Sequence, residues 1–293
     1  MENDLKSDNH NNPNIPNNRR KILLGMFLFP LLITVGMAIF LCTAVFLTQE
    51  NETPETMITA IKTGTPSKRW QKAFELSNEL NIKKEAIRSE GLRNELIHIL
   101  LDAEQYDTKT RSYIAMALAH FNDPESVMAL IQILHNPAED EDVSVAVLDT
   151  LGKLHAKDAI TDIFLFLSHK SKDLRMVACY VLGSLGQKEA ISHLEPLLND
   201  TVAEVQWNAA LNLAQLGSNA GENILIKMLD RQSLQNQHQV SDSNTESIMI
   251  NAIKGLTMIH STDCLNLLQQ IAENDPSLKV RHMAMEATKL LQP

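Results

Sequence analysis

Apolar residues recur along the middle of the chain in a twelve-residue pattern that returns at a fixed interval. The three clearest copies are VSVAVLDTLGKL at 143–154, LRMVACYVLGSL at 174–185 and VQWNAALNLAQL at 205–216, each starting 31 residues after the last. The first, fifth, ninth and twelfth places of every copy are apolar, and at 100° per residue these places lie within an arc of about 80°. Each copy therefore predicts an amphipathic helix, and self-similarity at this period predicts a solenoid of stacked units.

A second apolar segment precedes each copy, so the unit of the stack is expected to be a pair of helices. The expected pairs are 57–62 with 68–80, 92–101 with 110–121, 127–134 with 143–154, 160–167 with 174–185, 191–198 with 205–216, 224–229 with 248–259, and 265–271 with 280–291. The tenth place of the three clearest copies is small (Gly152, Gly183, Ala214), which lets a neighbouring helix come close. We therefore expect an all-α, right-handed α-solenoid of about six to seven helical hairpins over residues 57–293, with Leu182 and Leu213 buried.

The interval lengthens most after the copy at 205. The next match begins at Ile248, 43 residues on, so about a dozen residues are inserted. The inserted stretch at 231–247, RQSLQNQHQVSDSNTES, is polar and has no periodicity. We expect it to form a polar loop that protrudes from the solenoid and contributes little to the fold.

The N-terminal part of the chain is predicted to consist of a tail, a transmembrane helix and a linker. Residues 1–21 are rich in Asn and poor in apolar side chains, which predicts a disordered tail. Residues 22–49 contain no Asp, Glu, Lys or Arg, and a transmembrane helix needs about 20 apolar residues. The alternative is a cleaved signal peptide, whose apolar region is usually about 7–15 residues. Residues 50–56 are expected to form a linker.

Positive charge predicts the orientation of this span. Arg19, Arg20 and Lys21 precede it, and the nearest basic residue after it is Lys62. Because basic flanks stay on the cytoplasmic side, the N-terminus is expected in the cytoplasm. The repeat domain is then expected outside it, which in a bacterium is the periplasm.

The repeats resemble HEAT repeats of the short type found in phycobilisome lyases. The likeness is carried by DLRMVA at 173–178, VLGSLG at 181–186, AISHLEPLLND at 190–200 and Lys279-Val-Arg281 with Ala284. With its apolar helix the chain is also similar to membrane-anchored HEAT-repeat proteins of bacteria. The resemblance implies a scaffold for protein–protein interaction without catalysis. A lyase-like or chaperone-like accessory protein that handles a cofactor-bearing partner is the alternative.

Composition and motifs narrow the classes of partner and ligand that the chain is expected to bind. The chain has 36 acidic and 26 basic residues, and the acidity lies beyond residue 50, which disfavours nucleic acid. Deoxyhypusine hydroxylases, which are HEAT-like enzymes, take their iron ligands from His-Glu dipeptides, and this chain has none. The ten histidines lack metal-site spacing. We therefore expect no catalytic residues, metal, cofactor or small-molecule substrate, and a protein partner instead.

Six residues are candidates for partner binding: Arg175, Tyr180, Gln206, Asn208, Asn212 and Gln215. The resemblance to HEAT repeats implies that Arg175, at the second place of its copy, reaches an acidic residue of an adjacent repeat, although a ligand remains open. Asn208, Asn212 and Gln215 form a stripe at i, i+4 and i+7 that is either a solvated face or a row of hydrogen-bonding groups for an extended peptide. Tyr180 is either packed between repeats or an exposed anchor.

Two histidines occupy a position where their sister repeats have glycine. His155 and His260 directly follow the twelfth place, where Gly186 and Gly217 stand in other copies. This position is expected to be a helix C-terminus.

Overall fold

The structure is a computed structural model that describes residues 18–48, 53–82, 89–236 and 238–292. All regular elements within these ranges are helical, which confirms the all-α class. The chain divides into two compact units, residues 1–52 and 53–293. Residues 1–17 of the expected tail and residues 49–52, in and beside the expected linker, lie outside the described ranges.

The first unit contains one long helix, α1 (Asn18–Thr48). It begins ahead of residue 22, so it includes the three basic residues that precede the apolar run. Its segment Gly25–Ala44 has a mean hydropathy of 2.3 and is not buried by any other part of the unit. By length and composition this helix is able to cross a membrane.

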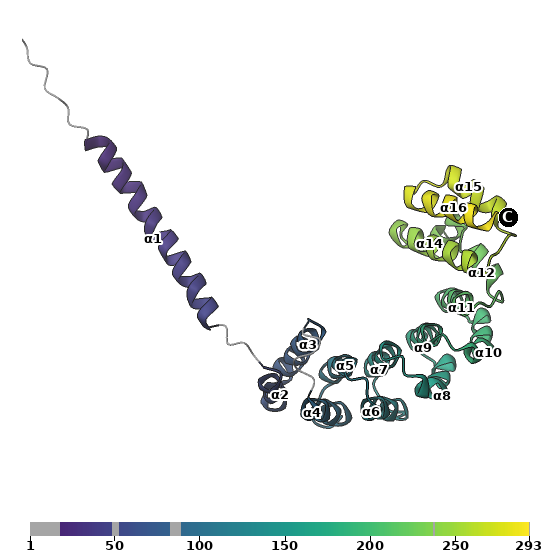
Figure 1. The fold of residues 1–293 in the computed structure, drawn as a ribbon, viewed down its shortest axis with the longest axis horizontal. Coiled ribbons are helices and arrows are strands. Elements are labelled where there is room, and N and C mark those ends of the chain that lie inside the picture. Colours follow the sequence, from purple (N-terminus) through teal and green to yellow (C-terminus); the bar gives the residue numbers. More distant parts are fainter. Residues whose placement is uncertain (1–17, 49–52, 83–88, 237, 293) are drawn as a thin grey trace, which may run out of the picture. The chain divides into compact units, whose positions relative to one another are not determined.

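The second unit is a solenoid of seven helical pairs (Figure 1). The pairs are α2 (Pro54–Thr63) with α3 (Pro66–Ile82); α4 (Glu90–Leu101) with α5 (Thr108–Leu118); α6 (Pro124–Leu134) with α7 (Glu141–Lys153); η1 (Lys157–Ala159), α8 (Ile160–Phe164) and η2 (Leu165–Ser168) with α9 (Lys172–Leu185); η3 (Lys188–Ala190), α10 (Ile191–Leu194) and η4 (Glu195–Asn199) with α11 (Ala203–Gln215); α12 (Glu222–Lys227) with α14 (Asp242–Met258); and α15 (Leu265–Asn274) with α16 (Leu278–Leu291). Helix α13 (Arg231–Asn236) stands between α12 and α14.

The second helices of the pairs stack directly on one another. Helix α3 packs on α5, α5 on α7, α7 on α9, α9 on α11, α11 on α14 and α14 on α16. In Figure 1 these helices form the inner row of the solenoid and the first helices form the outer row. The expected solenoid is confirmed, and its right-handed sense stays a prediction.

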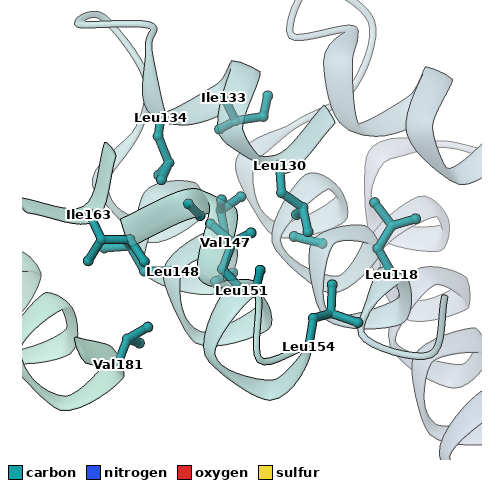
Figure 2. Close-up of a cluster of buried hydrophobic side chains, with 14 of the residues drawn as sticks. Leu118, Leu130, Ile133, Leu134, Val147, Leu148, Leu151, Leu154, Ile163 and Val181 are labelled. Carbon is teal, nitrogen blue, oxygen red and sulfur yellow. The ribbon is translucent and has the colours of Figure 1, made fainter. Parts of the chain in front are cut away.

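The apolar places of the pattern make the core. Leu151, Leu182 and Leu213, all at the ninth place, have no exposed surface, as expected for two of them. Figure 2 shows Leu118, Leu130 and Leu151, which come from three different helices, in one cluster of buried side chains. Full burial of such a side chain stabilises the fold by about 1.5–3 kcal/mol relative to exposure.

The small tenth place receives a side chain of the next copy. A Cβ added to Gly152 would lie 3.2 Å from Cγ2 of Val181, and one added to Gly183 would overlap the carboxamide of Asn212. Val181 and Asn212 are both the eighth residue of their copies. The eighth-place side chain of one copy therefore packs into the notch that the small tenth place of the preceding copy leaves, at Gly152 and again at Gly183. This is the predicted close approach of neighbouring helices.

One residue directly beyond the C-terminal end of four of these helices, the first or second after the helix, lies in the left-handed region. Gly186 and Gly217 have φ of 68° and 82°, and His155 and His260 have φ of 50° and 53°. The expected helix C-termini are confirmed. The two histidines adopt a conformation that favours glycine.

The expectation of a protruding loop at 231–247 is wrong. Residues 231–236 form α13, and α14 already begins at Asp242. Leu234 is only 2% exposed, and α13 packs on α14. One apolar side chain without a periodic neighbour is enough to fix this short helix. The linker is also shorter than expected, because α2 begins at Pro54 behind the capping side chain of Thr53.

Candidate partner-binding surface

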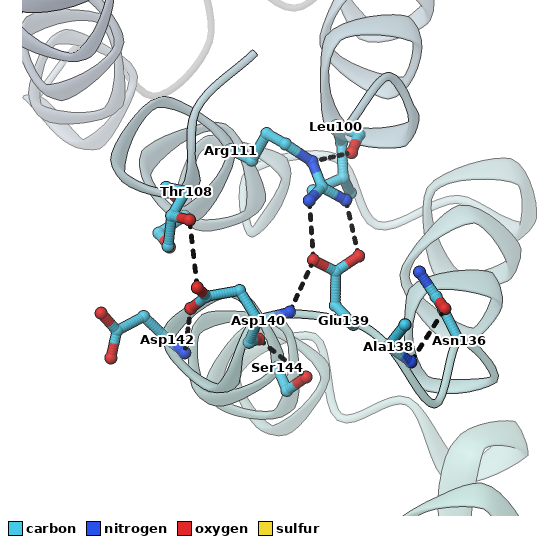
Figure 3. A network of polar contacts seen from close by, with 10 residues as sticks. Leu100, Thr108, Arg111, Asn136, Ala138, Glu139, Asp140, Asp142 and Ser144 are labelled. Carbon is cyan, nitrogen blue, oxygen red and sulfur yellow. Dashed lines mark hydrogen bonds and ion pairs between the residues drawn. The ribbon is translucent and has the colours of Figure 1, made fainter. Parts of the chain in front are cut away.

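Arginine side chains join successive repeats at the turns between paired helices. Arg111 of α5 donates to both carboxylate oxygens of Glu139, at 2.7 and 2.8 Å, and to the carbonyl of Leu100 at 2.7 Å (Figure 3). Arg175 of α9 makes the same paired contact with Asp200, at 2.7 and 2.8 Å. Arg175 therefore has the structural role expected of it.

The side chain at the second place of the pattern also donates a hydrogen bond to the backbone carbonyl of the residue six positions earlier. Arg175 donates to the carbonyl of His169 at 2.8 Å, and Gln206 donates to that of Asp200 at 2.6 Å. Arg281 donates to the carbonyl of its sixth preceding residue at 3.2 Å. Arg175 and Gln206 thus meet at Asp200, one at its carboxylate and the other at its carbonyl.

The carboxylates of these contacts stay ionised at lower pH than usual. Burial by itself would raise the pKa of Glu139, but hydrogen bonds from Arg111 and from the Asp140 amide hold the pKa below its ordinary value. Burial acts in the same direction on Asp200, and hydrogen bonds from Arg175 and the Val202 amide again lower its pKa below the ordinary value. Both acids are therefore held as charged partners.

Helix α13 supplies a contact that the pattern lacks. The second place of the copy at 248 is Met249, which cannot pair with a carboxylate. Arg231 takes this role and donates to Asp275 at 2.8 and 3.0 Å. Asp275 stands six residues before Arg281, as Asp200 stands before Gln206.

Two arginines of these contacts, Arg111 and Arg231, were not identified from the sequence. The second place would have revealed Arg111, whereas no periodic signal marks Arg231.

The candidate stripe on α11 is interrupted. Asn212 is only 4% exposed, and its amide donates to the carbonyl of Asn208 at 2.7 Å. Asn208 in turn donates to the carbonyl of Glu204 at 2.8 Å and is half-buried, whereas Gln215 is exposed. Asn212 therefore packs between repeats, and a continuous row of free amides does not exist on this helix.

Asn212 also contacts a buried thiol. Its amide lies 3.7 Å from Sγ of Cys179. Burial raises the pKa of the Cys179 thiol to about 12, against the opposing effect of this hydrogen bond. A thiol in that state is a structural group and not a nucleophile.

The exposed side of α9 and α11 is partly apolar. Tyr180 is 56% exposed. Met176, Val177 and Leu211 are half-buried on the same two helices, with Gln215 exposed beside them. Tyr180 is therefore on the surface and not packed between repeats.

A hollow opens where α11 meets the inserted helix. The insertion hollow has a volume of about 690 Å³ and is lined by residues of η4, α11, α12 and α13 and by the flanking positions (Leu198, Asn199, Ala203, Gln206, Trp207, Ala220, Ile224, Lys227, Asp230, Ser233, Leu234, His238). The rings of Trp207 and His238 lie 5.1 Å apart at 79° to each other. Of the six sequence candidates, only Gln206 lines this hollow.

Possible metal ligands are not grouped together in the described part of the chain. Among residues 18–48, 53–82, 89–236 and 238–292, no three His, Cys, Asp or Glu side chains are placed to hold a metal ion. The polar contacts around Arg111, Arg175 and Arg231 bind protein groups to protein groups.

Comparisons with known proteins agree with this architecture. HEAT repeats match residues 94–164 and 161–237, whereas no curated protein matches the sequence. The complex of CpcE and CpcF of phycocyanin lyase from Nostoc sp. PCC7120 has 21% identity and a TM-score of 0.52, covering 82% of this chain and 95% of that chain. Human deoxyhypusine hydroxylase has 18% identity and a TM-score of 0.34, with 81% and 84% covered. A designed armadillo repeat protein has 15% identity and a TM-score of 0.42, with 82% and 100% covered. At 21% identity the likeness to the CpcE–CpcF structure is one of fold.

Proposed function

We propose that this chain, whose residues 94–237 are HEAT repeats, is a membrane-tethered scaffold that binds another protein along its inner row of helices. The observation that carries the proposal is the exposed side of α9 and α11. Tyr180 there is 56% exposed although its neighbours in the pattern are buried. Tyrosine is enriched at protein interfaces. The scaffold has no catalytic role in this proposal.

The tether in this proposal is α1. Its segment Gly25–Ala44 is apolar over 20 residues, longer than the apolar region of a usual signal peptide. The basic residues Arg19, Arg20 and Lys21 precede it, which favours a cytoplasmic N-terminus and an extracytoplasmic repeat domain. The mass of the mature chain isolated from membranes tests retention, because cleavage would remove α1.

An accessory role for a cofactor-bearing partner is the second candidate. It is favoured by the fold similarity to the CpcE–CpcF complex, which at 21% identity concerns the fold alone. Visible absorbance that co-purifies with this chain and its partner would support this role over a plain scaffold.

The experiment that tests the scaffold compares substitutions on the inner and the outer helix of one repeat. The chain is solubilised from native membranes and captured with its partners, as wild type and with Tyr180→Ala or Leu165→Ala. Leu165 lies on η2 of the same pair, in the outer row, and is 64% exposed. The proposal expects Tyr180→Ala to reduce the captured partner and Leu165→Ala to leave it unchanged. Equal capture by both variants would overturn the assignment of the inner row.

A further inference from the structure

The insertion hollow has the size of a ligand site. Its volume is about 690 Å³, and ligand sites commonly measure about 300–1,000 Å³. An extended chain advances about 3.3 Å per residue, so a few residues of a peptide fit along it. The hollow exists because α13 is inserted beside α11 and α12, a feature that occurs once in the described solenoid.

Two aromatic rings form a corner in the hollow. Trp207 belongs to α11 and is half-buried, whereas His238 follows α13 and is exposed. Their planes are nearly perpendicular, at 79°. A cation or a methylene chain fits such a corner, and the indole face attracts cations.

Charge decides which ligand this corner favours. The hollow itself is lined by one carboxylate, Asp230, and one ammonium group, Lys227. Asp230 accepts from the Ser233 amide with one oxygen, at 3.0 Å. The segment that forms the hollow is acidic, because residues 195–238 contain five acidic and two basic side chains. A positive ligand is therefore attracted to this region and a negative one repelled.

Amide groups complete the match to a peptide. Asn199 and Gln206 lie in the wall of the hollow, and side-chain amides pair with the N–H and C=O groups of an extended backbone. The Gln206 amide nitrogen already donates to the carbonyl of Asp200, so its oxygen is the group offered to a peptide N–H. Leu198, Ile224 and Leu234 give the hollow an apolar part. The combination suits a peptide better than a free ion.

We propose that the insertion hollow binds an extended basic peptide segment of a partner protein and holds one Arg or Lys side chain against Trp207, His238 and Asp230. This inference rests on the proposed function, since the segment belongs to the scaffold's partner. It adds a second contact surface, separate from Tyr180, and assigns the partner a positive charge at that point.

Fluorescence anisotropy on the full chain in detergent tests the inference. Two labelled nonapeptide pools are degenerate at all positions except the centre, which is Arg in one pool and Glu in the other. The Arg pool is expected to bind at least about tenfold more tightly, and its affinity to fall with added salt. Equal binding of both pools, or preference for the Glu pool, would overturn the proposal.

Variants locate the binding. Asp230→Asn removes the charge but keeps an acceptor for the Ser233 amide, and is expected to weaken the Arg pool about tenfold. His238→Ala is expected to weaken it as well, and Lys227→Ala to strengthen it. Asn223→Ala, an exposed change on α12 outside the lining, is the control and leaves binding unchanged. An Asp230→Asn variant with wild-type affinity would reject the hollow, while partner capture through Tyr180 would remain intact.

Discussion

At the scale of single residues, His155 and His260 occupy helix ends where the sister repeats carry glycine. Their φ angles of 50° and 53° lie in the left-handed region, which costs an L-residue about 1–2 kcal/mol. Glycine avoids this strain but adds freedom to the unfolded chain. The two effects oppose each other, and the strain is the larger.

We therefore predict that His155→Gly stabilises the solenoid by about 0.5–1 kcal/mol, measured by urea unfolding. Gly186→Ala is the reciprocal change and is expected to destabilise by about 1 kcal/mol. A His155→Gly variant that unfolds at lower urea than the parent would mean that the imidazole makes a stabilising contact which outweighs the strain.

The notch at Gly183 gives a second prediction. A methyl group there overlaps the carboxamide of Asn212, so Gly183→Ala is expected to cost about 1–3 kcal/mol by overpacking. Gly91→Ala is the control, because Gly91 is an exposed residue of α4 where an added Cβ would meet only Ser89 Oγ, at 4.0 Å. That change should stabilise by about 0.5–1 kcal/mol. If both variants melt alike, the inner helices are not as close as described.

At the scale of elements, the Arg–carboxylate contacts make stability depend on pH. The folded pKa values of Glu139 and Asp200 are below their ordinary values. Each contact therefore stabilises the fold fully above the unfolded pKa, near about 4, and loses its effect as pH falls through the folded pKa. Stability should decline on acidification below about pH 4.

The test compares Arg175→Met with the parent between pH 7 and pH 3. The destabilisation by Arg175→Met should be largest at pH 7 and shrink as the pH falls toward the lowered pKa of Asp200, because protonation of Asp200 then removes the pairing from the parent as well. Lys153→Met, which removes an exposed pair with Asp149, should change stability by less than about 1 kcal/mol at every pH. A constant difference for Arg175→Met across this range would contradict the assigned pairing.

Helix α13 is expected to hold the last two pairs together. Arg231 pairs with Asp275, whose side chain is 5% exposed, and breaking a buried pair by removing one partner is costly. Leu234→Ala should cost about 2 kcal/mol or more by leaving a cavity, as measured by thermal melting. Gln232→Ala, an exposed change on the same helix, should be nearly silent. If Leu234→Ala left the melting temperature unchanged, the insertion would contribute little to the fold, as the sequence predicts.

The pattern along the sequence predicts the elements that repeat and misses those that do not. Places one, five and nine located the inner helices, because a helix face needs regular spacing. Helix α13 has a single buried residue, Leu234, and such a short element leaves no periodic trace. The burial of Asn212 could not be predicted from the pattern either, because it depends on the packing of Asn212 against Gly183 of the preceding copy. For Tyr180 the sequence left packing between repeats and surface exposure both open, and its 56% exposure came only from the structure.

At the scale of the whole molecule, orientation across the membrane is the outstanding prediction. The basic residues Arg19, Arg20 and Lys21 predict a cytoplasmic N-terminus and an extracytoplasmic solenoid. Protease added outside intact bacterial spheroplasts should degrade residues 53–293 and spare the N-terminal segment. A cytoplasmic protein in the same cells must stay intact as the control. Protected repeats would place the scaffold in the cytoplasm.

The central claim, that the inner row is the partner-binding face, is tested most directly by site-specific photo-crosslinking in native membranes. A photo-reactive phenylalanine replaces Tyr180 in one sample and Leu165 in another, so that the two probes stand on opposite rows of the same helical pair. The account predicts a discrete crosslinked protein from position 180 and none from position 165. The same product from both positions, or a product from position 165 alone, would contradict it.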